Sequence, residues 1–165
     1  MPDEQLVVVC GLPGVGKTTV AEAIAGWLEA DLLRTDVVRA DVVAEPAYTP
    51  EERQRVYDEL CSRARERLGD GHSVVLDGTF ARRTWREQTA ALARETGSQH
   101  RLVVVECAEP IARERLRDRD GDESDADPEV YDELKASFEP VEQADHRIDN
   151  GGSVERTLGR LDDMF

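Results

Sequence analysis

Lysine is almost absent from this chain of 165 residues: of its 21 basic residues, only Lys17 and Lys135 are lysine. The 36 acidic residues outnumber the basic ones and give a net charge of −15. A dense carboxylate surface stays hydrated in high salt, so the composition indicates a protein of an acidic proteome. The same charge opposes long contact with a phosphate backbone, and we therefore expect no extended nucleic-acid partner.

Cysteine and long apolar runs are also scarce. Cys10, Cys61 and Cys107 are odd in number, widely separated and without C-x-x-C spacing. This excludes a disulfide framework or a zinc site and predicts buried apolar thiols. No apolar run approaches the roughly 18 residues of a membrane span. Residues 1–5 are acidic where a secretory signal is basic, so we expect no membrane contact and a cytoplasmic location.

A glycine-rich stretch near the amino end, residues 11–18, reads G-L-P-G-V-G-K-T. It follows the apolar run 6–10 and leads into a helix-forming run, which is the context that the motif G-x-x-x-x-G-K-[ST] requires. Glycine allows close approach to a phosphate chain, and successive backbone N–H groups then point at the anion. The predicted nucleotide-binding residues are Gly11, Pro13, Gly14, Val15, Gly16, Lys17, Thr18 and Thr19.

Three side chains around this loop predict ATP and Mg²⁺ as its ligands. Lys17 can reach the β- and γ-phosphate oxygens, and the Thr18 hydroxyl can bind Mg²⁺. Asp77 ends the apolar run 73–76, and an acid in that place holds Mg²⁺ beside a phosphate loop. The alternative is that Asp77 only caps the turn at Gly78. The predicted metal residues are Thr18 and Asp77.

A second acid follows a short apolar strand. Asp36 is followed three residues later by Arg39, which places the two on one helical face. A carboxylate there can accept the proton of an acceptor hydroxyl while the arginine holds the acceptor's anionic group. An N-cap aspartate with a local ion pair has the same spacing, and on spacing alone both interpretations stay open.

Arginines gather on two further segments. In the predicted helix 109–119, Arg115 and Arg119 flank the buried stripe, and an arginine that closes over a migrating phosphoryl group stabilises its charge. A solvated helix surface is the alternative. Arg82 and Arg86 share a helical face and can hold an anionic acceptor or pair with surface acids. These two interpretations also stay open.

Strands that alternate with helices of 10 to 15 residues predict an α/β fold with a doubly wound parallel sheet. Repeats, low-complexity tracts and linkers are absent, so we expect one domain, 1–165. In the first helix, Val20, Ile24, Trp27 and Leu28 form the expected inward stripe. We expect strands at 6–10, 32–35, 73–77, 101–107 and 146–149, and helices at 17–30, 37–44, 50–68, 81–96, 110–119, 128–138 and 153–165.

The next helix has a complete start signal in the sequence. Thr49 stands at the N-cap, Pro50 at the first helical position, and Glu52 three residues after the cap, which predicts a capping box. Tyr48, just before it, can line a pocket or serve as ordinary packing, and the sequence does not decide between the two.

Together these motifs resemble the small P-loop kinases that include polynucleotide 5′-hydroxyl kinase domains, gluconate kinase and chloramphenicol phosphotransferase. The likeness is closest to the predicted-kinase branch of that group and covers nearly the whole chain. It is carried by residues 11–18, 35–39, 75–79 and 115–119, the last followed by Ser124 and Asp125. The resemblance implies a three-layer P-loop NTPase fold with a mainly parallel five-stranded sheet and a short mobile lid at about residues 113–127.

By this resemblance Asp36 matches the general base, Arg39 the residue that contacts the acceptor's phosphate or the transition state, and Arg119 the lid arginine. Arg115 is the second candidate for that arginine from its place on the helix. The implied activity is transfer of the γ-phosphoryl group of Mg-ATP to a hydroxyl of a small-molecule or nucleotide acceptor. A polynucleotide 5′-hydroxyl kinase, which needs only a single 5′ end in an arginine-lined pocket, is the alternative. A nucleotide-dependent switch is disfavoured because an N-K-x-D element is absent around Lys135.

Overall fold

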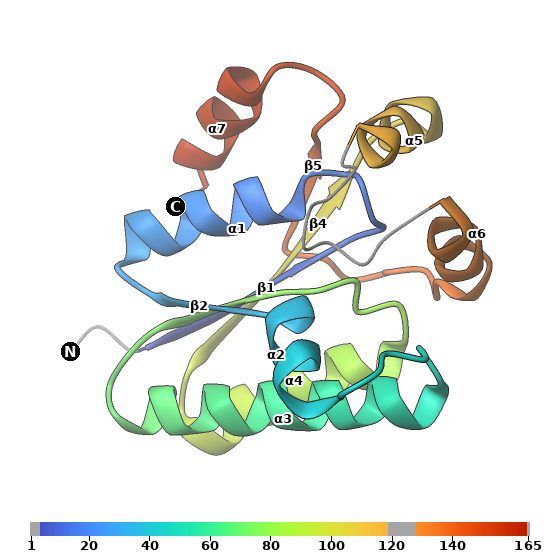
Figure 1. Cartoon of the computed structure of the whole chain (residues 1–165). Coiled ribbons are helices and arrows are strands. Elements are labelled where there is room, and N and C mark those ends of the chain that lie inside the picture. The colour runs from blue at the N-terminus through green and yellow to red at the C-terminus, as the bar shows by residue number, and fades with distance from the viewer. Residues whose placement is uncertain (1–3, 119–127, 165) are drawn as a thin grey trace.

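The fold is a parallel β-sheet covered by helices on both faces (Figure 1). It is known from a computed structural model, which describes residues 4–118 and 128–164. The strand order is β2-β3-β1-β4-β5, and each neighbouring pair is parallel. The predicted α/β class and five-stranded sheet are therefore confirmed. The strands are β1 (Gln5–Cys10), β2 (Asp31–Arg34), β3 (Val74–Asp77), β4 (Gln99–Glu106) and β5 (His146–Asp149).

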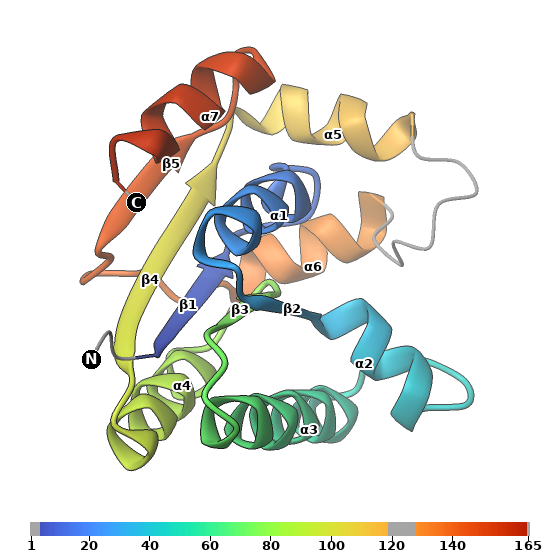
Figure 2. The same cartoon turned by 90° about the vertical axis from the view of Figure 1, so that its left-hand side faces the viewer.

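Helices form the two outer layers. Both views place α1 and α7 over one face of the sheet and α3 and α4 over the other (Figure 1 and Figure 2). No helix within residues 4–118 and 128–164 is long and apolar enough to cross a membrane. The helices are α1 (Lys17–Leu28), α2 (Thr35–Val42), α3 (Pro50–Gly69), α4 (Arg83–Thr96), α5 (Glu109–Arg117), α6 (Pro128–Ser137) and α7 (Val154–Asp162).

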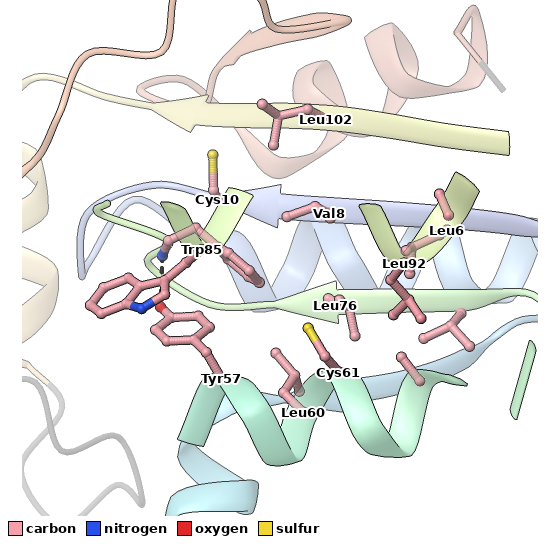
Figure 3. Close-up of a cluster of buried hydrophobic side chains, with 14 of the residues drawn as sticks. Leu6, Val8, Cys10, Tyr57, Leu60, Cys61, Leu76, Trp85, Leu92 and Leu102 are labelled. Atoms are coloured by element: carbon pink, nitrogen blue, oxygen red, sulfur yellow. Dashed lines mark hydrogen bonds between the residues drawn. The ribbon is translucent and has the colours of Figure 1, made fainter. Parts of the chain in front are cut away.

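The central strand β1 is buried on both faces, as expected of a parallel strand between two helical layers. Leu6 and Val8 pack with the apolar side chains of α3 and α4, as Figure 3 shows. Val7 and Val9 face the other way and pack with those of α1 and α7. Full burial of each such side chain contributes about 1.5–3 kcal/mol, so the strand that carries the loop is firmly held.

The inward stripe predicted for α1 is wrong at Trp27, whose residue surface is 43% exposed. Ala21 and Ala25 take inward positions instead, next to Ile24, and the stripe continues to Leu28. Trp27 therefore lies beside the stripe on the solvent side. The helix also ends earlier than expected, because the chain turns into the left-handed region directly after Leu28.

The second strand begins and ends one residue earlier than predicted, and its acid belongs to a helix. β2 ends at Arg34, and α2 begins at Thr35, so Asp36 lies in the first turn of α2. The cap of α3 forms as predicted on one side, because Thr49 Oγ1 accepts from the Glu52 N–H at 3.2 Å. The Glu52 carboxylate reaches farther back than a capping box requires and accepts from the backbone N–H groups of Ala47 and Tyr48.

Candidate phosphate and acceptor site

The glycine-rich loop connects β1 to α1 and has the backbone that only glycine adopts without strain. Gly14 and Gly16 have φ of 83° and 91°, in the left-handed region. A Cβ on Gly14 would lie 2.5 Å from the Ala112 carbonyl oxygen, and one on Gly16 would lie 2.2 Å from the Asn150 amide nitrogen. Both glycines are thus required by conformation and by space. Gly16 is also the residue before α1, so the first N–H groups of that helix open at the loop.

Thr18, in the first turn of α1, meets Asp77, the last residue of β3. Thr18 Oγ1 donates to Asp77 Oδ2 at 2.7 Å. Lys17, the preceding residue, donates from Nζ to the Leu12 carbonyl oxygen at 3.0 Å, back across the loop. A hydroxyl and a carboxylate oxygen are ligands that Mg²⁺ accepts, and the pair therefore fits a magnesium ion that keeps several waters.

Asp77 is a buried acid surrounded by positive charge. Burial raises the pKa of its carboxyl, while the charge of Lys17, the hydrogen bond from Thr18 and the charge of Arg34 act in the opposite direction. The Arg34 Nε lies 3.7 Å from Asp77 Oδ2. A buried carboxylate that is costly to ionise gains most from a cation placed beside it, which agrees with a metal-binding role.

Asp36 faces the same cleft from the start of α2. Its Oδ2 is 2.8 Å from Arg34 Nη2, and its Oδ1 accepts from the Val37 N–H at 2.8 Å. Arg34 therefore contacts both acids of the cleft. Arg39, predicted to share a face with Asp36, pairs instead with Glu52 at 3.6 Å and lies over the Tyr48 ring at 4.9 Å.

One cleft of about 360 Å³ joins these groups. It holds most of the predicted loop residues, both acids and Arg39, and Tyr48 lines it, which favours the pocket interpretation of that residue. Gly11 and Val15 do not line it. The lining residues are Pro13, Gly14, Gly16, Lys17, Thr18, Thr19, Arg34, Thr35, Asp36, Arg39, Tyr48, Arg53, Tyr57, Asp77, Gly78, Thr79, Trp85, Val130 and Leu134.

The predicted lid arginines lie apart from this cleft or outside the described residues. Arg115 does not line the cleft, and its guanidinium donates to the carbonyl oxygens of Gly14 at 3.3 Å and Asn150 at 2.7 Å. Arg119 and most of the predicted lid, residues 119–127, lie outside the described residues. In this structure Arg115 thus binds the backbone of the glycine-rich loop at Gly14 and does not face the cleft.

Arg82 and Arg86 do not line the cleft either. Arg86 is buried, and it donates to the carbonyl oxygens of Phe80 at 2.8 Å, Ala81 at 3.0 Å and Pro140 at 3.2 Å. Burial lowers the pKa of its guanidinium. The sequence offered two partners for Arg86, an anionic acceptor or surface acids. In the structure its hydrogen bonds go to backbone carbonyl oxygens instead.

Sequence reasoning missed Asn150, which braces the loop from β5. Its side-chain N–H donates to the Val15 carbonyl oxygen at 2.8 Å, and its Oδ1 accepts from the Thr157 hydroxyl at 2.6 Å. In the sequence Asn150 stands directly before two glycines, a pattern typical of an ordinary turn. Asn150 is the single asparagine of the chain, and that rarity was the available signal. Arg53, on α3, was also missed because it lies in an ordinary charged helix pattern.

The parallel sheet, the glycine loop between its central strand and α1, and the paired hydroxyl and acid define the class of P-loop kinases. Residues 6–141 match the family described as AAA domain, and the chain belongs to this family of the P-loop kinase group. An uncharacterised protein of Mycobacterium tuberculosis, Rv2004c, is 34% identical over 174 residues, which cover 94% of this chain and 34% of that protein. The chain therefore spans about a third of that relative's length.

Solved structures share the fold at low sequence identity. A sugar kinase of Janibacter sp. superposes with a TM-score of 0.76 at 20% identity, over 96% of this chain and 92% of that one. The APS kinase CysC of Mycobacterium tuberculosis, solved with AMPPNP and APS, superposes with a TM-score of 0.76 at 18% identity, over 99% of this chain and 98% of that one. The predicted P-loop kinase fold is thus confirmed.

Proposed function

We propose that this protein transfers the γ-phosphoryl group of ATP to a hydroxyl of a small-molecule or nucleotide acceptor. The observation that carries the proposal is the common cleft of Lys17, Thr18, Asp77 and Asp36, which combines a phosphate loop, a metal-binding pair and a second acid. The second acid lies beside an arginine-lined wall, so an acceptor with an anionic group would find both a proton acceptor and a cation there. The sugar kinase and the APS kinase act on small molecules, which supports an acceptor of that size.

In the proposed reaction the hydroxyl oxygen of the acceptor forms a bond to the γ-phosphorus, and the bond from that phosphorus to the bridging oxygen breaks. ADP leaves, and the hydroxyl proton passes to the Asp36 carboxylate. Lys17 and Arg34 neutralise charge on the phosphates. Mg²⁺, held by Thr18 and Asp77, supplies further charge neutralisation when bound.

Asp36→Asn tests the proposal. The amide cannot accept the proton, so transfer should fall by at least about a hundredfold while ATP affinity stays unchanged. The assay uses radiolabelled ATP with pooled sugars, sugar acids, nucleosides, nucleotides, aminoglycosides and 5′-hydroxyl oligonucleotides, at low and high salt. The oligonucleotide arm separates the small-molecule kinase from the 5′-hydroxyl kinase alternative.

Asp41→Asn is the matched control, because Asp41 lies on the same helix, pairs with Arg63 at 3.0 Å and does not line the cleft. It should transfer as well as the unaltered protein. Full activity of Asp36→Asn removes Asp36 from the mechanism. ATP binding without transfer to any pool contradicts the kinase proposal itself.

A further inference from the structure

The cleft has a helical wall, which we define as the lining residues contributed by α2, α3, α4 and α6 and the segment before α3. Asp36, at the start of α2, is the acid of this wall, and Arg39 and Arg53 are its cations. Their side chains are only 12% and 13% exposed, so both guanidiniums are held within the wall rather than in open solvent. The wall also contains Tyr48, Tyr57, Trp85, Val130 and Leu134.

The charge of the cleft is opposite to that of the chain. Four cations line it against two acids, although the net charge of the protein is −15. Arg34 already contacts both of those acids, Asp36 at 2.8 Å and Asp77 at 3.7 Å. Arg39 and Arg53 pair instead with acids that do not line the cleft. Positive charge concentrated in a cleft of an acidic protein attracts an anion specifically to that cleft.

The wall combines these arginines with aromatic rings, and the Arg39 guanidinium lies 4.9 Å from the centroid of the Tyr48 ring. Burial raises the pKa of the Tyr57 hydroxyl, and the charges of both Arg39 and Arg53 oppose this rise. Tyr57 packs against Trp85 with ring centroids 4.3 Å apart, and both rings are labelled in Figure 3. Arg39 and Arg53 thus line the cleft together with stacked aromatic rings.

Their acidic partners differ in one respect that matters for binding. Glu52, the partner of Arg39, is 8% exposed and accepts from two backbone N–H groups at 2.7 and 2.8 Å, so it is fixed. Glu133, the partner of Arg53, is 59% exposed, and its Oε1 lies 3.3 Å from Arg53 Nη2. An exposed carboxylate can move into water at little cost, because surface ion pairs are weak. Arg53 therefore has an exchangeable partner.

We propose that Arg53 determines acceptor specificity by binding an anionic group of the acceptor, and that the Glu133 carboxylate occupies this place until the acceptor displaces it. The inference rests on the proposed function, since it assigns the wall to the acceptor. The acceptor class is a hydroxyl compound that carries its own phosphate, sulfate or carboxylate. A guanidinium binds all three groups through paired N–H donors.

Binding is measured in a Trp27→Phe background. The chain has two tryptophans, so this change leaves Trp85, which lines the cleft, as the single fluorescent reporter. The probes are glucose 6-phosphate and gluconate against glucose, and AMP against adenosine, with calorimetry as a second readout. At least one charged probe should bind about tenfold or more tightly than its uncharged counterpart.

Two variants with opposite effects test the assignment. Arg53→Gln should weaken binding of the charged probe about tenfold and leave the uncharged one unchanged. Glu133→Gln should tighten binding of the charged probe severalfold, because the internal competitor has lost its charge. A purely structural ion pair predicts no such gain. Arg65→Gln is the matched control, since Arg65 lies on the same helix, pairs with Glu95 and does not line the cleft.

The outcomes separate this inference from the proposed function. Equal affinity for charged and uncharged probes, or equal loss in Arg53→Gln and Arg65→Gln, overturns the anion site even if transfer to a neutral alcohol is found. Weaker binding of the charged probe in Glu133→Gln contradicts the proposal that the acceptor displaces the Glu133 carboxylate from Arg53. Arg53-dependent binding without transfer to any probe or pool supports the anion site and contradicts the kinase proposal.

Discussion

At the scale of single residues, the loop depends on a side chain from the other end of the chain. The Asn150 amide donates to the Val15 carbonyl oxygen, and its own carbonyl oxygen accepts from Thr157. Asn150 is buried, so the groups that it satisfies have no access to solvent when it is removed. Its backbone carbonyl also accepts from Arg115, which in turn donates to Gly14. One residue thus connects the loop to β5, α5 and α7.

Asn150→Ala should lower the free energy of unfolding by about 1–3 kcal/mol, because it leaves the buried Val15 carbonyl without its side-chain donor. The Thr157 hydroxyl is then left with the Ser153 carbonyl as its remaining acceptor. Urea unfolding measures this loss, and ATP affinity should fall in the same variant because Val15 is no longer held. Asn150→Asp keeps the acceptor for Thr157 but places negative charge at the Val15 carbonyl, so it should not rescue stability. A variant as stable as the unaltered protein would show that the brace is dispensable.

At the scale of elements, the start of α3 positions one wall of the cleft. Thr49 Oγ1 caps the helix, and the Glu52 carboxylate holds the two N–H groups before it. The same carboxylate pairs with Arg39 of α2. Tyr48, whose φ of 55° is unusual for a residue with a side chain, lies within this arrangement and lines the cleft. A helix terminus therefore doubles as part of the site.

Thr49→Ala should lower the free energy of unfolding by about 1 kcal/mol, since it removes the oxygen that accepts from the Glu52 N–H. Thr49→Ser keeps that oxygen and should be close to unchanged. The midpoint of thermal unfolding, followed by circular dichroism, distinguishes the two. Equal loss in both variants would mean that the Thr49 methyl group, rather than its hydroxyl, stabilises the helix start.

At the scale of the whole molecule, charge repulsion opposes folding. The 36 acidic residues exceed the 21 basic ones by 15, and compacting the chain brings these charges together. Individual surface ion pairs, such as Arg65 with Glu95 at 2.9 Å, offset little of this repulsion. Salt screens charge over about 10 Å at 0.1 M and about 3 Å at 1 M. Added salt therefore stabilises the folded state.

Raising NaCl from 0.1 to 2 M should raise the thermal midpoint, by about 2–4 °C for each kcal/mol of repulsion relieved in a chain of this size. KCl should act equally, because screening depends on ionic strength and not on the cation. Scanning calorimetry at constant pH provides the measurement. A midpoint that stays level or falls with salt would contradict self-repulsion as a significant opposing force.

The features that could be predicted from the sequence are those that depend on residues close together in the chain. The parallel strands, the cap at Thr49 and the meeting of Thr18 with Asp77 all follow from short motifs and from the common edge at which parallel strands end. The contacts that sequence reasoning missed join distant positions. Asn150 reaches Val15 across 135 residues, and Arg53 reaches α6 across 80. No motif spacing encodes such pairs, since they exist only once the layers have packed.

The brace at Asn150 also bears on the order in which the molecule is completed. The glycine motif is complete once synthesis has passed Thr18, but the amide that supports it, on Asn150, follows 132 residues later. Both neighbours of β1 in the sheet, β3 and β4, arrive in the interval. The nascent chain therefore contains the glycine motif early, but the hydrogen bond from Asn150 to Val15 can form only after β5 and Asn150 have been synthesised.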